Sequence, residues 1–543
     1  MIPNVPASPI DKYPSPVIKA EGQVLFPLQE YAYHRVHFDL IMFDHPPPGP
    51  ALSYANVGRP LPPGPPSYPI IGQLLSMPQT TEGPEFANLS KTLKSDIISL
   101  SGLGTTIVVL NSTNANNDLL EKRAKIYSGR FCTPMISSPQ LMDLRDFVAF
   151  MDSNDSWKEQ RRAISAQLNT RSVCNFRSSQ DQQARRLLQR FLDVCGRLES
   201  SDELEQEFYR AVSAVFFDTV YGYELKSLDD PFHIDNMTLN NNITESLMPS
   251  KFLVNVFPWL QYIPGWVPGA GWKKKAYEWR EQKNRTMDGV YNWTKQRVTE
   301  RVDDYSIISS TIKDAQKAGW GETEIDTFAK NLGTALLVGG SGLSTTAFSW
   351  FILALALFPE AQAKAQSEID EVIGPDRLPT FDDQPRLPYV QRLLLEVLRW
   401  QAPAPLGVPH MCTKDDEYQG YRIPKGAIMI GNIWAFNQDG DQYKDPDMFN
   451  PDRFLDPSVP PPPIFGSGLR ICPGRYFFQD LFFIQAVLIL ATFKVGRYKD
   501  KQGHEIEPVR RVIAGSAVAH PATFKLKVSP RSRQHVELIQ TAL

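Results

Sequence analysis

The segment Phe465-Gly-Ser-Gly-Leu-Arg-Ile-Cys-Pro-Gly474 decides how the rest of the sequence is interpreted. Its three glycines allow a tight loop without Cβ atoms, in which a thiolate can lie close to a flat cofactor. The apolar run that begins at Tyr476 predicts a helix, and the amides and dipole at a helix start stabilise a thiolate at Cys472. Arg470 offers a fork-shaped donor for a carboxylate. The segment therefore predicts a cysteine ligand for a flat cofactor, and an ordinary buried cysteine in a glycine-rich turn is the alternative.

The composition is that of an ordinary globular protein. The chain has 543 residues, of which 42% are hydrophobic and 22% are charged, and this excludes a collagen, a coiled coil and a wholly disordered chain. Its 57 Lys and Arg residues against 60 Asp and Glu residues leave a net charge of −3, so no basic field indicates a nucleic-acid partner. The five cysteines are irregularly spaced, without a CxxC pair. This argues against a disulfide scaffold and for a reducing compartment.

Helical periodicity dominates from about residue 178 to residue 399. Charged and apolar residues alternate at helical spacing in four segments, Gln183–Leu198, Asp202–Tyr221, Lys273–Val302 and Pro359–Val372. Strand-like composition marks five other segments, residues 96–100, 106–110, 418–423, 427–432 and 522–528. The predicted fold class is therefore mainly α with small β-sheets (α+β).

Three parts of the chain are expected from its local composition. Residues 1–59 lack periodicity, and their longest apolar runs, Val24–Leu28 and Leu40–Phe43, are far shorter than the about 20 residues that span a bilayer. We therefore expect an irregular N-terminal tail without a transmembrane anchor. The proline-rich segment Leu61–Gly72 stiffens the backbone and forbids a helix, which marks the entrance to a single domain over residues 60–535. A C-terminal tail is expected over residues 536–543.

One long stretch, Asn331–Phe358, contains no charged residue. By hydropathy alone it is a transmembrane candidate, flanked by Lys330 and Glu360. Its middle carries glycines, serines and threonines, and a long core helix that bends around a ligand would have the same composition. The stretch by itself leaves both interpretations open.

The Cys472 segment resembles the haem-binding loop of the cytochrome P-450 family in its Phe, Gly, Arg, Cys and Gly positions. Other motifs follow in that family's order. Glu396-Val-Leu-Arg399 resembles its Glu-x-x-Arg helix, and Arg453 resembles the residue that completes this triad. Trp157-Lys-Glu-Gln-Arg161 matches its Trp-x-x-x-Arg, and His410 lies where a further propionate donor is often found. The resemblance extends from the proline-rich segment almost to the C-terminus.

The resemblance implies the cytochrome P-450 fold, with a long central helix over a haem that the Cys loop holds. Residues 60–535 would then be a haem-thiolate catalytic domain with haem b as its cofactor. Cys472 would be the axial ligand of the iron, and Phe465 would belong to the haem-binding loop. The expected propionate donors are Arg470, Trp157, Arg161 and His410. The expected structural residues are Glu396, Arg399 and Arg453.

The central helix departs from the family pattern, Ala/Gly-Gly-x-Asp/Glu-Thr-Thr, whose acid and threonine serve the protonation of dioxygen. This chain has Val338-Gly-Gly-Ser-Gly-Leu-Ser-Thr-Thr346. In one register Thr345 is the alcohol and Ser344 replaces the acid. In the other, Gly342 and Leu343 replace the acid and the threonine, and Ser344 is the nearest hydroxyl donor. The second keeps the family's spacing to the next helix and is preferred.

The catalytic candidates are therefore Ser344 and Thr345, and neither register supplies a carboxylate. We expect slow or leaky oxygenation, or a substrate that brings its own proton donor.

The function implied is a monooxygenase that inserts one atom of O₂ into an apolar, terpenoid-like or lipid-like molecule of fungal secondary metabolism. Electrons would come from NADPH through NADPH-cytochrome P-450 reductase, with cytochrome b5 as a further candidate donor and with Lys158 and Arg162 as docking residues. The protein is expected to be a monomer. The family predicts the cytoplasmic face of the endoplasmic reticulum, whereas the lack of an anchor favours a cytoplasmic or peripheral protein. Two alternatives are an oxygen-independent isomerase or dehydratase and a catalytically impaired haem-binding protein.

Overall fold

The computed structural model describes residues 59–69, 71–78, 81–197, 199–248, 251–302, 305–514 and 516–542. Within it, residues 58–543 form one compact unit. The expected N-terminal tail lies outside the described residues, apart from residue 59.

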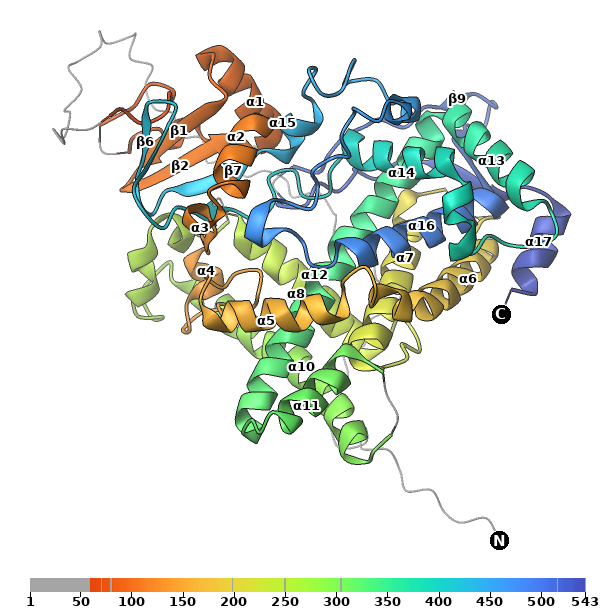
Figure 1. The fold of residues 1–543 in the computed structure, drawn as a ribbon, viewed down its shortest axis with the longest axis horizontal. Coiled ribbons are helices and arrows are strands. Elements are labelled where there is room, and N and C mark those ends of the chain that lie inside the picture. Colours follow the sequence, from red (N-terminus) through yellow and green to blue (C-terminus); the bar gives the residue numbers. More distant parts are fainter. Residues whose placement is uncertain are drawn as a thin grey trace. The chain divides into compact units, whose positions relative to one another are not determined.

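Helices make up most of the described chain (Figure 1). They are α1 (Glu82–Leu93), α2 (Thr113–Asn116), α3 (Ala124–Tyr127), α4 (Pro134–Ser137), α5 (Asp155–Gln167), α6 (Arg177–Val194), α7 (Ser201–Phe216), α8 (Pro231–Leu247), α9 (Leu253–Val256), α10 (Gly271–Thr299), α11 (Ile307–Lys317), α12 (Glu322–Leu357), α13 (Pro359–Ile373), α14 (Pro388–Trp400), α15 (Ile433–Asn437), α16 (Arg475–Thr492) and α17 (Arg533–Gln540). The four helices predicted from periodicity correspond to α6, α7, α10 and α13. In α6, for example, Ala184, Leu187, Leu188 and Phe191 form one buried face at helical spacing.

The helix α12 covers the uncharged stretch and lies in the core. In Figure 1 it runs through the middle of the view, between α10 and α14. Phe348 of α12 stacks on Phe208 of α7, with ring centroids 5.0 Å apart, and meets Phe482 of α16 edge-on at 5.1 Å. Both α12 and α16 are long and apolar enough to cross a membrane, but 67% and 78% of their most apolar windows are buried inside the protein. Their apolar composition is therefore used in packing against other helices.

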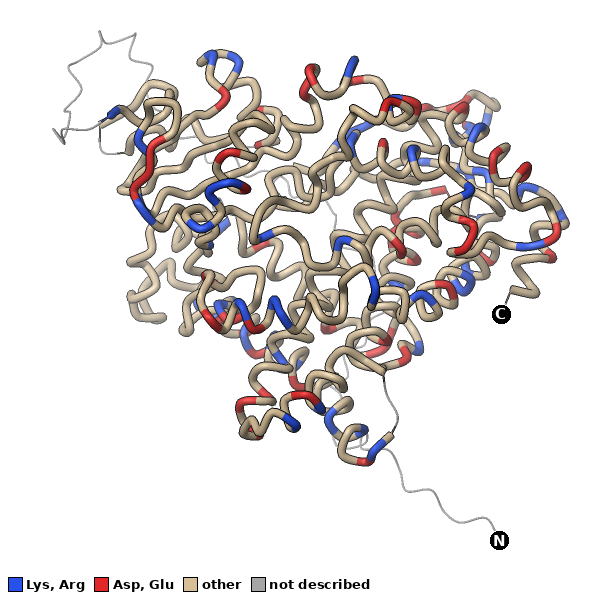
Figure 2. The backbone as a smooth tube through the Cα atoms, in the orientation of Figure 1, with Lys and Arg blue, Asp and Glu red and all other residues tan. Residues whose placement is uncertain are grey.

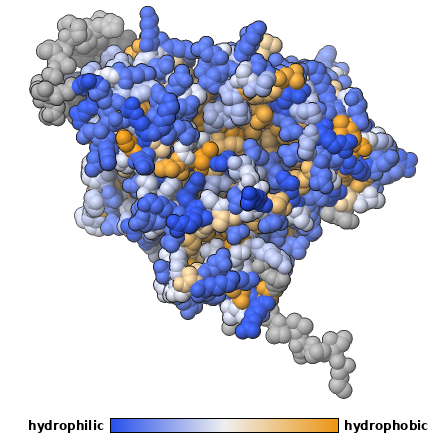
Figure 3. Space-filling view, viewed as in Figure 1, coloured by the Kyte–Doolittle hydropathy of each residue, from blue (hydrophilic) through white to orange (hydrophobic). Residues whose placement is uncertain are grey.

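Three small sheets complete the unit. The strands are β1 (Ile97–Gly102), β2 (Thr105–Leu110), β3 (Gly129–Arg130), β4 (His410–Met411), β5 (Asp416–Tyr418), β6 (Tyr421–Ile423), β7 (Ile428–Gly431), β8 (Phe493–Lys499), β9 (Glu505–Ile506) and β10 (Leu526–Pro530). The largest sheet has the order β1-β2-β7-β4-β3, and its β2–β7 pair is parallel. The predicted strands overlap β1, β2, β5 with β6, β7 and β10, and the fold class is as predicted. Hydrophilic residues predominate on the face of the molecule shown in Figure 3, and apolar residues form scattered patches there.

The C-terminal end differs from the expected tail. Residues 536–540 belong to α17, whose Ile539 is fully buried. The Ile539 carbonyl accepts a hydrogen bond from Gln189 of α6, and Ser532 caps the helix start by accepting from the His535 amide. A cap followed by an apolar residue that reaches the core is enough to order this short helix.

Candidate functional site

The loop that carries Cys472 is held tightly from both sides. The Cys472 amide donates to the Phe465 carbonyl at 2.8 Å, which closes the loop. Gly468 has a left-handed φ of 57°, and a Cβ there would lie 2.1 Å from the Leu120 carbonyl oxygen. Ser467 accepts from the Asn116 side chain at 2.8 Å. Glycine is therefore required at 468 by both conformation and space.

Burial raises the pKa of the Cys472 thiol above its ordinary value, and three neighbouring groups oppose this rise. The residue keeps part of its surface exposed, and α16 begins three residues later. Desolvation raises the pKa of the Cys472 thiol, whereas the Gly474 amide and the charges of Arg161 and Arg475 lower it. A metal ligand must be the thiolate, and these three groups are the ones that stabilise it.

The helix α5 brings Trp157 and Arg161 to the Cys472 loop. Asn154 caps α5 by accepting from the Trp157 amide at 2.8 Å. Arg161 donates to the Ile471 carbonyl at 2.8 Å, so α5 fastens the residue before Cys472. The Trp157 ring lies against the Arg470 guanidinium, which is 4.3 Å from the ring centroid. The predicted residues on α5 and in the loop are thus brought together.

Arg470 is buried with one guanidinium nitrogen unsatisfied. It donates to the carbonyls of Ser128 and Met151, each at 2.9 Å, while its Nη1 is buried without a hydrogen-bond partner. Burial lowers the pKa of Arg470 to about 10. A buried donor without an acceptor is unfavourable, so this nitrogen marks a place where an acceptor from outside the chain would be stabilising.

A second buried arginine, Arg130, was not predicted from the sequence. It lies in β3 directly opposite His410 in β4, donates to the carbonyls of Val408 and Pro409, and leaves its Nε without a partner. Burial and the nearby Arg470 lower the pKa of Arg130 to about 9. The only signal in the sequence is an arginine in a two-residue strand, which carries no function by itself.

His410 faces the same region. Its Nδ1 lies 2.8 Å from the Tyr127 carbonyl, so that nitrogen carries the proton and donates. Burial and the charge of Arg130 lower the pKa of His410 to about 3. The histidine is therefore neutral over the physiological pH range.

These groups fit a haem. The charge of Arg470 lowers the pKa of Arg130, and the charge of Arg161 lowers the pKa of Arg470, as cations held close together do. Arg130 and Arg470 each have a buried nitrogen without an acceptor. Two carboxylates, such as haem propionates, would satisfy both nitrogens and offset the repulsion. A thiolate at Cys472, with its amide and arginine partners, would ligate the iron. The donor set thus fits both the iron and the propionates of the same cofactor.

The predicted triad is assembled as a buried charge network. Arg399 makes a two-pronged contact with Glu396 at 2.8 and 2.9 Å. Arg453 approaches the same carboxylate at 3.0 Å, and the Asn450 amide donates to it at 2.8 Å. The remaining arginine nitrogens donate to the carbonyls of residues 437, 444, 445 and 448. The triad therefore ties α14 to the segment that precedes the Cys loop.

The central helix exposes Gly339 and Leu343 rather than its hydroxyl residues. Leu343 is 37% exposed, while Ser344 and Thr345 are 3% and 2% exposed. The Thr345 hydroxyl donates to the Ser341 carbonyl at 2.9 Å. On a helix Thr345 is rotated by about 200° from Leu343. The exposed positions 339 and 343 are four residues apart and therefore lie on one face of the helix. Ser344 and Thr345 do not lie on that face, and their side chains are buried.

Comparison with known proteins gives a consistent result. The family model for cytochrome P450 matches residues 62–528. The chain belongs to the cytochrome P450 family. A cytochrome P450 monooxygenase from Armillaria gallica is 34% identical over 491 residues, covering 88% of this chain and 94% of the relative. Another from Postia placenta is 35% identical, covering 89% and 93%. A tryptamine 4-monooxygenase from Psilocybe cyanescens is 32% identical, covering 89% and 96%.

This P450 is an oxidoreductase, a monooxygenase of fungal type, and its family implies a haem cofactor and a redox partner. The monooxygenase relatives do not favour the isomerase or the impaired haem protein considered as alternatives. Fungal members are often associated with the endoplasmic reticulum.

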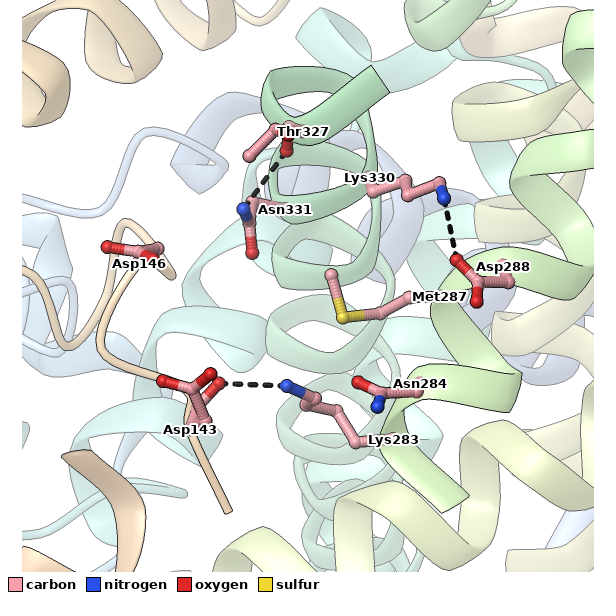
Figure 4. Close-up of a pocket in the computed structure, with 9 residues that line it drawn as sticks. All are labelled: Asp143, Asp146, Lys283, Asn284, Met287, Asp288, Thr327, Lys330 and Asn331. Carbon is pink, nitrogen blue, oxygen red and sulfur yellow. Dashed lines mark hydrogen bonds and ion pairs between the residues drawn. The ribbon is translucent and has the colours of Figure 1, made fainter. Parts of the chain in front are cut away.

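A separate charged pocket of about 230 Å³ lies between α10, α12 and the segment 143–146 (Figure 4). Its ion pair joins Lys330 and Asp288 at 2.7 Å. Lys283 donates to the Asp143 carbonyl at 2.9 Å, and burial lowers the pKa of its ammonium. These contacts fasten α10 to the neighbouring segments, and the pocket's polar wall distinguishes it from the apolar face of α12.

Proposed function

We propose that this P450 uses haem b, bound through Cys472, to insert one atom of O₂ into an apolar small molecule with electrons from NADPH. The observation that carries the proposal is the pairing of a loop thiol at a helix start with two buried arginines whose nitrogens lack acceptors. When bound, a thiolate-ligated haem supplies the activation of dioxygen.

The chain's own residues would bind and orient the haem. Cys472 would ligate the iron, and Arg161 would keep the loop in place through the Ile471 carbonyl. Phe465 would support the loop, since its carbonyl holds the Cys472 amide and its ring meets the edge of Phe478. The proposed propionate donors are Arg130, Arg470 and Trp157. Compared with the predicted set, this assignment adds Arg130, gives Arg161 the role of holding the loop, and leaves out His410, whose single N–H donates to the Tyr127 carbonyl.

The substrate would lie against α12. Gly339 and Leu343 are its exposed residues near the middle, and no charge occurs from 331 to 358, so this face favours an apolar molecule of the kind found in fungal secondary metabolism. Tryptamine, named for the Psilocybe relative, belongs in a first screen beside terpenoids and fatty acids.

A flavoprotein reductase is the proposed electron donor, with cytochrome b5 as a second candidate. Figure 2 shows basic residues along α5, the helix that reaches the Cys472 loop. The Lys158 side chain is 59% exposed and Arg162 is exposed. An acidic partner would be attracted to this helix, and its electron would enter close to Cys472.

Membrane contact is proposed through the segment between α8 and α10. Leu253, Trp259, Tyr262 and Trp266 are 61–82% exposed, and exposed aromatic residues of this kind favour the interface of a bilayer. Such a contact would hold the protein at the endoplasmic reticulum surface and present the enzyme to apolar substrates dissolved in the membrane.

The test is the carbon monoxide difference spectrum of the reduced protein. Wild type is expected to show the strongly red-shifted Soret band of thiolate ligation. Cys472→Ala should lose it, and Cys174→Ala, which removes an exposed free thiol, should keep it. A wild-type band typical of a neutral ligand, or a band that survives in Cys472→Ala, would refute the proposal.

A further inference from the structure

The central helix lacks the two groups that would supply protons at its exposed face. Gly342 and Leu343 carry no ionisable or hydroxyl group, and Ser344 and Thr345 are buried to the side or behind. Oxygenation nevertheless consumes protons, so a proton source has to reach this face from elsewhere in the chain or from water.

Thr346 is the hydroxyl residue that shares the exposed face. It follows Gly339 by seven residues and Leu343 by three, which places all three on one side of α12. Its side chain is fully buried because His520 covers it. The Thr346 hydroxyl lies 3.1 Å from His520 Nδ1 and 3.4 Å from Nε2, and it also reaches the Gly342 carbonyl at 3.2 Å.

The loop that carries His520 is fixed by backbone contacts. The Ala519 amide donates to the Pro403 carbonyl at 2.8 Å, and the Ala519 carbonyl accepts from Trp350 Nε1 at 2.6 Å. The imidazole therefore has a defined place over α12, one turn along the helix from Leu343.

Glu205 of α7 approaches the same imidazole, also at Nδ1. Its Oε1 is 3.5 Å from His520 Nδ1, and the side chains of the histidine and the glutamate are 31% and 25% exposed. Glu205 and Ser349 also line a small space of about 10 Å³ between α7 and α12, which is the size of one water molecule. The carboxylate thus has access to water, whereas Thr346 does not.

We propose that Glu205, His520 and Thr346 form a proton relay into the oxygen-activating face of α12, in place of the acid and threonine that this chain lacks. The inference rests on the proposed function, since it concerns the protons that a monooxygenase consumes. Nδ1 is the ring nitrogen nearest to both Glu205 and Thr346, so the relay requires the ring to turn until Nδ1 pairs with Glu205 and Nε2 with Thr346. In that orientation the ring accepts a proton on one nitrogen and releases one from the other. The Thr346 hydroxyl takes up that proton and passes its own hydrogen on, and because this side chain is fully buried beneath His520, the same turn of the ring must open it to a water at the exposed face.

The relay balances the reaction. For a substrate RH, RH + O₂ + 2 H⁺ + 2 e⁻ gives ROH + H₂O, and the reductase supplies the two electrons. Both protons come from water through Glu205, and each relay residue returns to its starting state after each transfer. Without substrate, four protons and four electrons reduce O₂ to two H₂O, while two of each give H₂O₂.

The main test uses dioxygen itself as the probe. The haem-loaded full chain, reductase and NADPH are combined, and O₂ consumption and H₂O₂ release are measured. His520→Gln keeps a hydrogen-bonding group but cannot pass a proton, and Thr346→Val removes the hydroxyl without changing the shape. Each is expected to lower O₂ consumption about a hundredfold, at the low end of the range for loss of a general acid, and to raise the share of H₂O₂. Equal rates and shares in wild type and His520→Gln would overturn the relay.

A matched control and a bypass separate proton supply from folding. His504 pairs with Asp500 at 3.3 Å in the β8–β9 hairpin, so His504→Gln removes a similar pair elsewhere and should leave both measurements unchanged. Oxidation of an added phenol driven by cumene hydroperoxide needs no such proton supply and should be retained in His520→Gln and Thr346→Val. An equal fall in the rates of the NADPH-driven and the hydroperoxide-driven reactions would show a structural effect and overturn the relay. A loss of O₂ consumption in Thr345→Val but not in Thr346→Val would also overturn it.

Two further readouts complete the test. In the His520→Gln background, Gly342→Asp with Leu343→Thr places an acid and an alcohol on the exposed face and should restore O₂ consumption. If O₂ consumption did not recover, the defect would not be one of proton supply.

The nitrogen-15 NMR resonances of the His520 ring should shift in Thr346→Val and in Glu205→Gln. Unchanged resonances would overturn the hydrogen-bonded chain. The carbon monoxide band must be present throughout, so its absence in wild type would refute the proposed function and not the relay.

Discussion

Replacement of Arg130 by methionine distinguishes the contribution of this arginine to haem binding from its contribution to the stability of the fold. Arg130 is only 9% exposed, and burial together with Arg470 lowers its pKa from 12.5 to about 9. This difference in pKa means that keeping the Arg130 guanidinium charged destabilises the haem-free protein by about 5 kcal/mol. The variant Arg130→Met removes that term.

The same substitution removes two hydrogen bonds to the carbonyls of Val408 and Pro409. Hydrogen bonds from a charged group contribute about 1.5–3 kcal/mol each, so this loss is close in size to the gain. The free energy of unfolding of the haem-free protein should therefore change little. With haem bound, Arg130→Met also loses a charge-assisted bond to a propionate, which lowers haem affinity about ten- to hundredfold.

The measurements are urea unfolding of the haem-free protein at pH 7 and the rate of haem transfer to apomyoglobin. Arg145→Met is the control, because that arginine is 54% exposed and should leave both values unchanged. If Arg130→Met retained wild-type haem affinity, or if it weakened the haem-free protein as much as the haem-bound one, Arg130 would be a structural residue only.

Three other outcomes follow from the described contacts. Glu396→Ala leaves Arg399 and Arg453 buried without their carboxylate and should lower the free energy of unfolding by about 3–5 kcal/mol; an effect as small as that of a surface substitution would contradict this. Burial lowers the pKa of His233 from its ordinary 6.5 to about 4. As the pH drops from 6.5 toward 4, the unfolded chain therefore takes up a proton at this histidine before the folded chain does, and the free energy of unfolding falls. Urea unfolding should show that this free energy decreases by about 2 kcal/mol between pH 7 and pH 5 and by less in His233→Gln; the same decrease in both proteins would contradict this assignment. Replacement of Trp259 and Trp266 by serine should weaken sedimentation with phosphatidylcholine–phosphatidylserine vesicles about tenfold, and unchanged sedimentation would exclude this segment from membrane contact.

Much of the fold was predictable because its signals are local. The face of α6 follows from apolar residues three and four positions apart, and β1 and β2 follow from clustered β-branched residues. The stretch 331–358 was ambiguous, because a core helix and a membrane helix have the same composition. Packing of Phe348 against α7 and α16 settles it, and these contacts join residues distant in the chain. The C-terminal helix was missed because the burial of Ile539 and its hydrogen bond from Gln189 are contacts with distant parts of the chain.

The candidate site likewise contains residues that the sequence could identify and residues whose orientation only the structure could give. Cys472 with its glycines, Glu396 with Arg399, and Trp157 with Arg161 lie within a loop or one helical turn of each other, so their spacing could be recognised directly. The serine and threonine candidates were less reliable, since a register error of one residue rotates a side chain by about 100°. The exposed Leu343 and the buried Thr345 show which side of α12 is open.

The order of the residues was sufficient for the family and the class of reaction, because the motifs that indicate them depend on chemistry within a few neighbouring positions. The partners of Arg130 and of Thr346 could come only from the folded chain. Arg130 meets the Val408 carbonyl across 278 residues, and Thr346 meets His520 across 174. Contacts over such separations leave no periodic trace in the sequence, since they are set by how sheets and helices pack and not by the residues beside them.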